Sequence, residues 1–435
     1  MELGIIGYFL IPLGIYLFFK DAKYLLYLIV FFSGFTAASV INFGSTFSLQ
    51  PGYYFGIFFI IKTFLSMYNK KTLIRPNKFL FIFVIISILS IIMPTLINSK
   101  SIFIMNQSSL ITNIFFTSSN ITQLSYLLFC FILYLCIKNY FYHNPDEIEK
   151  SIKILVYSTI AVCLLGFYQE FAYLKHLEFD KFFRNGIRGN TQGAQNYFVR
   201  IYSVTQEPSM LGYFLAPMIA LGVSLEKNIL NNKYKILFLL LIIVTGILST
   251  STTFVVGLAA LILKVIFDKL MLFIKDIHNE SEKVGYILPI IFFTFILLLI
   301  VVVNLNPVIK DTLITGSYDK FMGNNLSGEE RSSIFKLLIN AAMHYPILGI
   351  GFGTARGKDL LSTWLCNVGF IAVGVFIIYL YKLITKLKNT SKLSYGISNY
   401  IFVLFACAFT SVPEPYNLFI WIIFAAAEVL IIKSI

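Results

Sequence analysis

Apolar runs of about 20 residues recur along the whole 435-residue chain. A helix of that length spans the hydrocarbon core of a bilayer, because each residue adds about 1.5 Å. Charged residues make up only 13% of the sequence, roughly half the share in a soluble domain. We therefore predict an all-α, polytopic integral membrane bundle of about 12 to 14 helices, with residues 1–435 forming one transmembrane domain. The predicted spans are residues 3–19, 24–41, 53–67, 79–97, 121–137, 152–172, 209–225, 236–248, 253–267, 284–303, 361–380, 397–411 and 418–432.

Lysine marks alternate joints between these runs. Joints 20–23, 70–78, 138–153, 226–235, 264–283 and 382–392 are rich in Lys, whereas joints 42–50, 249–252 and 412–417 contain no Lys or Arg. Because positively charged loops stay in the cytoplasm, we predict that the Lys-rich joints lie inside. The net charge of +13 is then a topology signal, and we expect no nucleic-acid partner. Two long connections, 173–207 and 304–360, and a polar, candidate re-entrant stretch, 98–120, fall outside, where we expect the functional residues.

Arginine is distributed differently from lysine. Five of the six arginines lie in the two long connections, which hold only six of the 28 lysines. A guanidinium binds phosphate oxygens through two parallel hydrogen bonds, so this clustering favours an anionic ligand, above all a pyrophosphate. Contact with lipid head groups, or salt bridges within the loops, is the alternative. The five arginines are Arg184, Arg188, Arg200, Arg331 and Arg356.

A helix is predicted in the second long connection. Ser327 and Glu330 have the spacing of a capping box, and apolar residues follow at helical spacing up to Pro346. Arg331 falls in the first turn, where a cation is unfavourable unless an anion compensates it. The helix N-terminus and Arg331 together would form a phosphate site. A local pair of Arg331 with Glu329 or Glu330 is the alternative.

Three glycines follow that helix, at Gly349, Gly351 and Gly353. A dinucleotide-binding loop follows a strand, whereas this run follows a helix and a proline, so we exclude that function. The glycines instead predict sharp turns or a close approach of the backbone to another group.

The first long connection ends in a carboxylate beside a proline. Pro208 suits the first turn of the next span, which places Glu207 at the membrane boundary, close to Arg200 and Tyr202. A carboxylate there is costly unless it is paired or used. We predict that Glu207 is partly buried and acts as a general base, the alternative being a helix cap paired with Arg200. The other candidates for the base are Glu330, Glu414 and His344.

No metal or cofactor is predicted. The four histidines are far apart in the sequence, and no Asp-x-Asp pair is present to hold a divalent ion. The five cysteines lie in or beside apolar runs without a Cys-x-x-Cys spacing, so we expect them to be packing residues.

Three segments, taken in order, resemble the O-antigen polymerase and O-antigen ligase superfamily. They are RIYSVTQEPSMLG at 200–212, GEER at 328–331 with YPILGIGFG at 345–353, and GFIAVG at 369–374. The resemblance implies a metal-independent glycosyltransferase with a GT-C-like helical fold. Such enzymes act on undecaprenyl-pyrophosphate-linked glycans at the periplasmic face of the bacterial inner membrane, where arginines of the outer loops bind the pyrophosphate.

The resemblance favours a polymerase over a ligase. Ligases of this group have a His just before the segment that matches 369–374, and residues 362–367 contain none. Polymerases are described with an Arg and a Gly ten residues apart in both loops, a spacing that Arg188 and Arg331 lack. On this basis Arg200 and Arg331, with Arg188 and Arg356, would hold the pyrophosphate, and Glu207 would be catalytic. Arg184 and Tyr202 are further candidates.

The expected partners are the lipid-linked oligosaccharide, membrane lipids and a chain-length regulator protein, and the expected product is O-antigen or a related surface polysaccharide. Two other classes stay open. A lipid-linked oligosaccharide flippase or another secondary transporter would also have about a dozen helices. A membrane scaffold is the third possibility, but it leaves the division of Arg and Lys unexplained.

Overall fold

The computed structural model describes residues 2–44, 47–70, 74–97, 102–186, 200–275, 326–388, 390–412 and 414–433. Most of these residues are helical, as the apolar runs predicted. The helices are α1 (Gly7–Phe18), α2 (Ala22–Phe32), α3 (Pro51–Lys70), α4 (Lys78–Ser90), α5 (Met93–Ile97), α6 (Ser118–His143), α7 (Asp146–Leu174), α8 (Phe179–Phe183), α9 (Pro208–Ser224), α10 (Asn232–Leu248), α11 (Thr252–Lys275), α15 (Leu326–His344), α16 (Leu360–Leu387), α17 (Lys392–Ser411) and α18 (Leu418–Lys433).

Within the described ranges, five helical stretches are long and apolar enough to cross a membrane, which confirms a helical membrane protein. They are Lys78–Ile97, which joins α4 and α5, and the helices α6, α7, α16 and α17. Shorter apolar helices include α1, α2 and α9. Twelve of the thirteen predicted spans contain a helix, and the span predicted at 284–303 lies outside the described residues.

Helices α9, α17 and α18 form the interior of the bundle, because almost every residue of α9 and all of residues 418–429 of α18 are buried. Small residues allow this close packing. A Cβ atom added to Gly257 of α11 would lie 2.4 Å from the Cβ of Ala216 in α9, and one added to Gly396 of α17 would lie 2.7 Å from the Cβ of Ser224. Small side chains at such contacts let helix backbones approach, which is how helices associate when the surrounding lipid is equally apolar.

Two small sheets accompany the helices, in segments where we predicted no strand. Strand β1 (Glu2–Leu3) pairs with β2 (Ile41–Phe43), which pairs with β3 (Phe47–Leu49). Strands β4 (Phe103–Met105) and β5 (Ile111–Asn113) form an antiparallel hairpin, so the candidate re-entrant stretch 98–120 is a hairpin where the structure describes it. Runs of only three residues bounded by turns are too short for apolar periodicity to predict a strand.

Helix α2 ends at Phe32, although the apolar run continues to residue 41. The backbone beyond it makes two short-range turns, and it also forms hydrogen bonds with the first long connection. The Ala37 N–H donates to the Val204 carbonyl at 3.0 Å, and the Gly186 N–H donates to the Ala37 carbonyl at 2.9 Å. These long-range bonds satisfy the polar backbone groups and replace the last turns of the predicted span.

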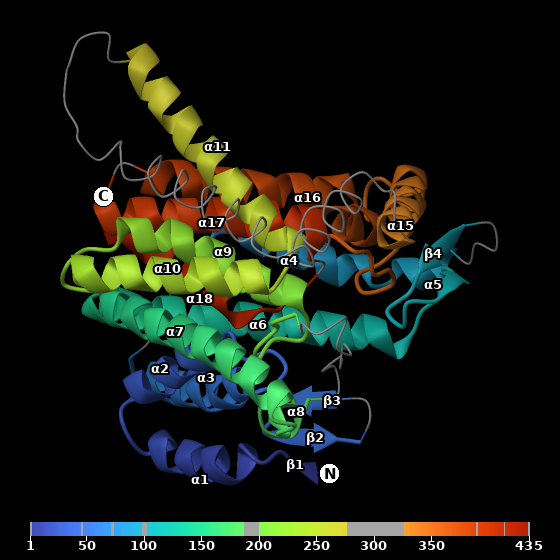
Figure 1. Cartoon of the computed structure of the whole chain (residues 1–435). Helices are drawn as coiled ribbons and strands as arrows, with labels where there is room; N and C mark the ends of the chain where they lie inside the picture. Colours follow the sequence, from blue (N-terminus) through green and yellow to red (C-terminus); the bar gives the residue numbers. More distant parts are fainter. Residues whose placement is uncertain are drawn as a thin grey trace, which may run out of the picture.

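The predicted outer joints gather at one end of the bundle (Figure 1). Strands β4 and β5 and helix α15 lie at the right-hand end of the view, and strands β1 to β3 and helix α8 lie at the right-hand ends of the lower helices. The joint between α9 and α10 and the C-terminus lie at the left. This grouping agrees with the alternation of Lys-rich and Lys-free joints.

Helix α16 is broken at Gly369, where φ is 77° and ψ is 176°. The chain after α15 packs into the break. The Ile350 N–H donates to the Cys366 carbonyl at 2.8 Å, and the Phe370 N–H donates to the Pro346 carbonyl at 2.7 Å. These bonds satisfy backbone groups that the break would otherwise leave free in an apolar region. The single span predicted at 361–380 is therefore two helical halves.

The glycine run adopts the sharp turns that the sequence predicted. Gly349, Gly351 and Gly353 have φ angles of 65°, 109° and 78°, a region that favours glycine. A Cβ atom added to Gly351 would lie 2.4 Å from Cδ of Pro94, and one added to Gly353 would lie 2.8 Å from Cβ of Gln123. The turn is therefore packed against α5 and α6.

Candidate functional site

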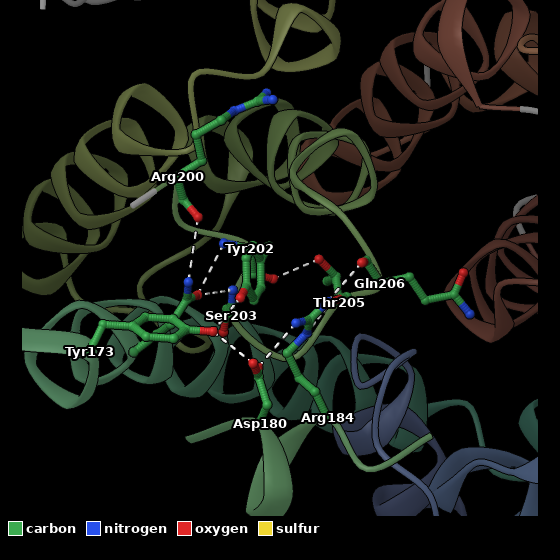
Figure 2. A network of polar contacts seen from close by, with 9 residues as sticks. Tyr173, Asp180, Arg184, Arg200, Tyr202, Ser203, Thr205 and Gln206 are labelled. Carbon is green, nitrogen blue, oxygen red and sulfur yellow. Dashed lines mark hydrogen bonds and ion pairs between the residues drawn. The ribbon is translucent and has the colours of Figure 1, made fainter. Parts of the chain in front are cut away.

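Arg184 is buried and binds the backbone of the turn that precedes α9 (Figure 2). Its side chain is only 1% exposed and forms an ion pair with Asp180 at 3.0 Å. Its Nε and Nη2 atoms donate to the carbonyl oxygens of Thr205 and Gln206 at 3.2 and 2.8 Å. The guanidinium also lies 3.8 Å from the centre of the Tyr202 ring. These contacts engage the guanidinium from several sides, so Arg184 holds the protein's own chain.

Tyr202 belongs to the same network and is also a structural residue. It is fully buried, and its hydroxyl lies 2.5 Å from that of Tyr173. The Gln169 side chain accepts the backbone N–H groups of Tyr202 and Ser203 at 3.1 and 2.7 Å. Ser203 has a φ of 52°, so this turn is fixed by side chains of α7 in a conformation that non-glycine residues rarely adopt.

Arg200 points away from the Arg184 network, as Figure 2 shows. Its Nε donates to Oγ1 of Thr250 at 2.6 Å, and its Nη2 donates to the Thr250 carbonyl at 3.1 Å. Thr250 lies in the Lys-free joint between α10 and α11. The first long connection and this short joint therefore meet at Arg200 and Thr250, in a region that we call the Arg200 surface.

Arg331 and Glu207 lie close enough to Arg200 to influence its ionisation. Burial lowers the pKa of Arg200, the Glu207 carboxylate raises it, and the positive charge of Arg331 lowers it. The described part of the chain offers Arg331 no hydrogen bond or ion pair, and Glu330 pairs with Lys358 instead, at 3.2 Å. The local pair that we considered for Arg331 is therefore not formed among the residues that the structure describes.

Glu207 differs from its predicted environment. It is the N-cap residue of α9, but its side chain is exposed and makes no capping hydrogen bond, so the expected partial burial is wrong. Pro208 occupies the first turn of α9 as predicted, and the Ser209 hydroxyl contacts the Glu207 carboxylate. The backbone is extended at Glu207, and its carboxylate is near enough to Arg200 to raise the pKa of that guanidinium.

Asp359 is a further charged residue on which the charge of Arg331 acts. It caps α16 by accepting the Ser362 N–H at 2.7 Å. Burial raises the pKa of Asp359, and among the weaker opposing influences is the positive charge of Arg331. The charge of Arg331 thus acts both on Arg200 and on Asp359, the N-cap residue of α16. His344 is at the far end of α15, exposed, with its ring 2.8 Å from the Asn340 carbonyl, so α15 separates it from Arg331.

Arg356 is placed by a different set of contacts. Its guanidinium pairs with Glu414 at 2.6 Å, and its backbone N–H donates to the Met105 carbonyl at 2.9 Å. The Asn367 amide binds both backbone groups of Ala355 at 2.9 Å, which fixes the orientation of the adjacent Arg356. Two candidates from distant connections, Arg356 and Glu414, are therefore partners of each other.

An open cavity lies at the same end of the bundle, with a volume of about 860 Å³ that includes its open mouth. Six parts of the chain build it: the segment after α2, the β3–α3 junction, α6, Gly186 after α8, the turn before α9 with the first turn of α9, and the joint between α17 and α18. Gln206 lines this cavity, and in Figure 2 its side chain points away from the Arg184 network. Residues 206 and 207 thus connect the cavity to the Arg200 surface.

Sequence analysis missed the polar residues of this cavity, such as Thr36 and Gln206. Thr36 stands in an apolar run that resembles a continuous span, and only its polar neighbours Ser33 and Ser39 indicate otherwise. Arg188 lies outside the described residues. In the part of the chain that the structure describes, no group of three or more His, Cys, Asp or Glu residues could hold a metal ion.

No protein-family model, curated protein or solved structure matches this chain. Its function is therefore inferred from its own residues and their geometry.

Proposed function

We propose that this protein polymerises oligosaccharide repeat units that are linked to undecaprenyl pyrophosphate. The product is O-antigen or a related surface polysaccharide, formed at the periplasmic face of the bacterial inner membrane. The enzyme is a metal-independent glycosyltransferase with the active site at the end of the bundle where the strands, α8 and α15 lie.

The observation that supports this proposal most is that the charge of Arg331 affects Arg200, although the two residues lie in different connections, 131 positions apart in the sequence. Two positive charges that act on each other are unfavourable unless an anion compensates them. Arg200 is oriented by Thr250, whereas Arg331 has no partner among the residues described. A pyrophosphate supplies several oxygens that both forks can bind.

In the proposed reaction, a hydroxyl oxygen of the acceptor sugar attacks the anomeric carbon of the donor. The bond between that carbon and the pyrophosphate oxygen breaks, and undecaprenyl pyrophosphate leaves. Glu207 takes the proton of the attacking hydroxyl. Arg200 and Arg331 stabilise the charge that develops on the leaving group, and each charged hydrogen bond contributes about 1.5–3 kcal/mol.

The polysaccharide of a strain that lacks this protein tests the proposal. A product of a single repeat unit attached to its acceptor is expected, because transport and ligation continue without polymerisation. Accumulation of cytoplasmic lipid-linked units would indicate a flippase instead, and unattached polymer would indicate a ligase.

The Arg331→Lys variant tests the pyrophosphate site in the same strain. Lysine retains the charge but loses the planar fork, so we expect polymer formation to fall by at least about tenfold while the protein remains in the membrane. Arg75→Lys is the matched control, because Arg75 is exposed in a Lys-rich joint, and its ladder should be normal. A normal ladder from Arg331→Lys would exclude the pyrophosphate role.

A further inference from the structure

Three aromatic rings form a row along the open cavity. The ring of Tyr126 lies 6.3 Å from Phe47 at an interplanar angle of 29°, and 5.5 Å from Tyr416 at 32°. All three rings are half-buried and line the cavity. Tyr53 helps to fix the row. Its buried ring packs edge-on against Tyr126, and its hydroxyl donates to the Tyr416 carbonyl at 2.7 Å. The rings are thus held in place by their neighbours and are partly exposed at the cavity.

Polar groups that suit hydroxyl ligands line the same cavity. Thr36 is only 7% exposed, and its hydroxyl has no hydrogen-bond partner within the described structure. The Gln50 amide donates to the Thr36 carbonyl at 2.8 Å, and the Gln206 amide donates to the same oxygen at 3.4 Å. Both amides keep a side-chain carbonyl that can accept a hydrogen bond from a ligand. A buried hydroxyl without a partner costs free energy unless a ligand or water completes it.

The cavity offers little net charge. Glu414 is the one charged residue in its described lining, and Glu414 is paired with Arg356 at 2.6 Å. A strongly charged ligand would therefore find no free counter-charge there. Aromatic faces combined with amides and a hydroxyl suit a ligand that has both C–H faces and hydroxyl groups.

We propose that this cavity, lined by Phe47, Tyr126 and Tyr416 with Thr36, Gln50 and Gln206, binds a neutral sugar residue of the lipid-linked glycan. The inference rests on the proposed function and adds a glycan subsite beside the arginines. Because Gln206 and Glu207 are consecutive, a glycan that occupies the cavity has a sugar next to the carboxylate proposed as base.

Protection of introduced cysteines from a maleimide reagent tests this subsite. The five native cysteines are buried, so an introduced cysteine is the main reactive site. Thr122→Cys reports on the cavity, because Thr122 is exposed and lines it. Ser332→Cys reports on the pyrophosphate site beside Arg331, and Ser108→Cys, in the exposed β4–β5 turn, is the control. The probe is the pool of lipid-linked glycans extracted from a strain without this protein, before and after mild acid removes the glycans.

The intact pool is expected to slow labelling of Thr122→Cys at least threefold and to leave Ser108→Cys unchanged, whereas the acid-treated pool should not protect Thr122→Cys. Protection of Ser332→Cys alone would overturn the sugar subsite and leave the proposed function standing. Protection of Thr122→Cys alone would support the subsite and contradict the pyrophosphate site. Equal protection by the acid-treated pool, or no protection at either position, would overturn the subsite.

Thr36→Val tests the unpartnered hydroxyl with little change of shape. Combined with Thr122→Cys, it should raise the glycan concentration needed for half protection about fivefold, the effect of losing one hydrogen bond. Ser39→Ala is the matched control, because Ser39 also has a buried hydroxyl without a partner among the described residues but does not line the cavity. Equal protection in both variants would remove Thr36 from the subsite.

Discussion

At the scale of the residue, Glu207 lies where the sequence predicted, but its surroundings differ from the prediction. The chain places its carboxylate beside Arg200, at the point where the first long connection becomes α9. The side chain is nevertheless exposed, so the protein alone does not shield it from water. A substrate that covers this surface would supply the desolvation that the protein alone lacks, because closure of a site over substrate excludes water.

Glu207→Gln therefore tests the base directly. The amide keeps the shape of the side chain but cannot take a proton, so we expect the purified variant to polymerise lipid-linked units at least about 100-fold more slowly. Glu178→Gln is the control, since Glu178 is an exposed acid of the same connection that pairs with Lys181 at the surface. A Glu207→Gln rate within a few-fold of the unmodified protein would mean that another residue is the base or that none is needed.

The arginines were predictable as a group but not individually. Their placement in two outer connections was visible in the sequence, yet Arg184 binds the protein's own carbonyl groups while Arg331 has no described partner. The difference depends on which backbone oxygens the fold brings near each guanidinium. Those oxygens belong to Thr205 and Gln206, and sequence pattern alone does not position them.

At the scale of the element, α16 and the glycine run before it form one unit. Apolar periodicity predicted the helix and composition predicted the turns, but the break at Gly369 was missed. A glycine inside an apolar run fits a continuous membrane helix equally well, so only the contacts across the break identify it. The strands β2 to β5 were missed for a related reason, since each is short and pairs with a neighbour that adds little apolar pattern.

Gly369→Ala should destabilise the protein, and Gly374→Ala should not. Gly369 has a φ of 77°, and a Cβ atom there would lie 2.4 Å from the Ile347 carbonyl oxygen, so a loss of about 2 kcal/mol or more is expected. A Cβ atom at Gly374 of the same helix meets nothing within 4 Å, so alanine should be neutral or add up to about 1 kcal/mol. Thermal unfolding of both proteins in one detergent measures the difference. Equal unfolding temperatures would show that the break tolerates a side chain.

At the scale of the whole molecule, the two ends of the bundle differ in chemistry. Near the Lys-rich joints, Glu428 accepts from Lys138, Tyr134 and Tyr379 at 2.6, 2.6 and 2.8 Å. Asp268 pairs there with Lys264 and with Lys388. Each buried acid thus has cationic and hydroxyl donors, and these bonds hold the ends of several helices together. The opposite end holds the strands, the open cavity, Arg200 and Arg331.

This polarity predicts a fixed orientation in the membrane. The Lys-free joints and the β4–β5 turn should face outward and the joint between α9 and α10 should face the cytoplasm, because positive charge retains loops inside. Ser108 and Asn228 are exposed residues of these two regions. A membrane-impermeant thiol reagent should label Ser108→Cys in spheroplasts and Asn228→Cys only after the inner membrane is broken. The protein without either substitution is the control and should label little, since its cysteines are buried. The reverse pattern would turn the bundle over and place the Arg200 surface and the cavity in the cytoplasm. A polymerase that takes its units from the periplasmic face would then be excluded.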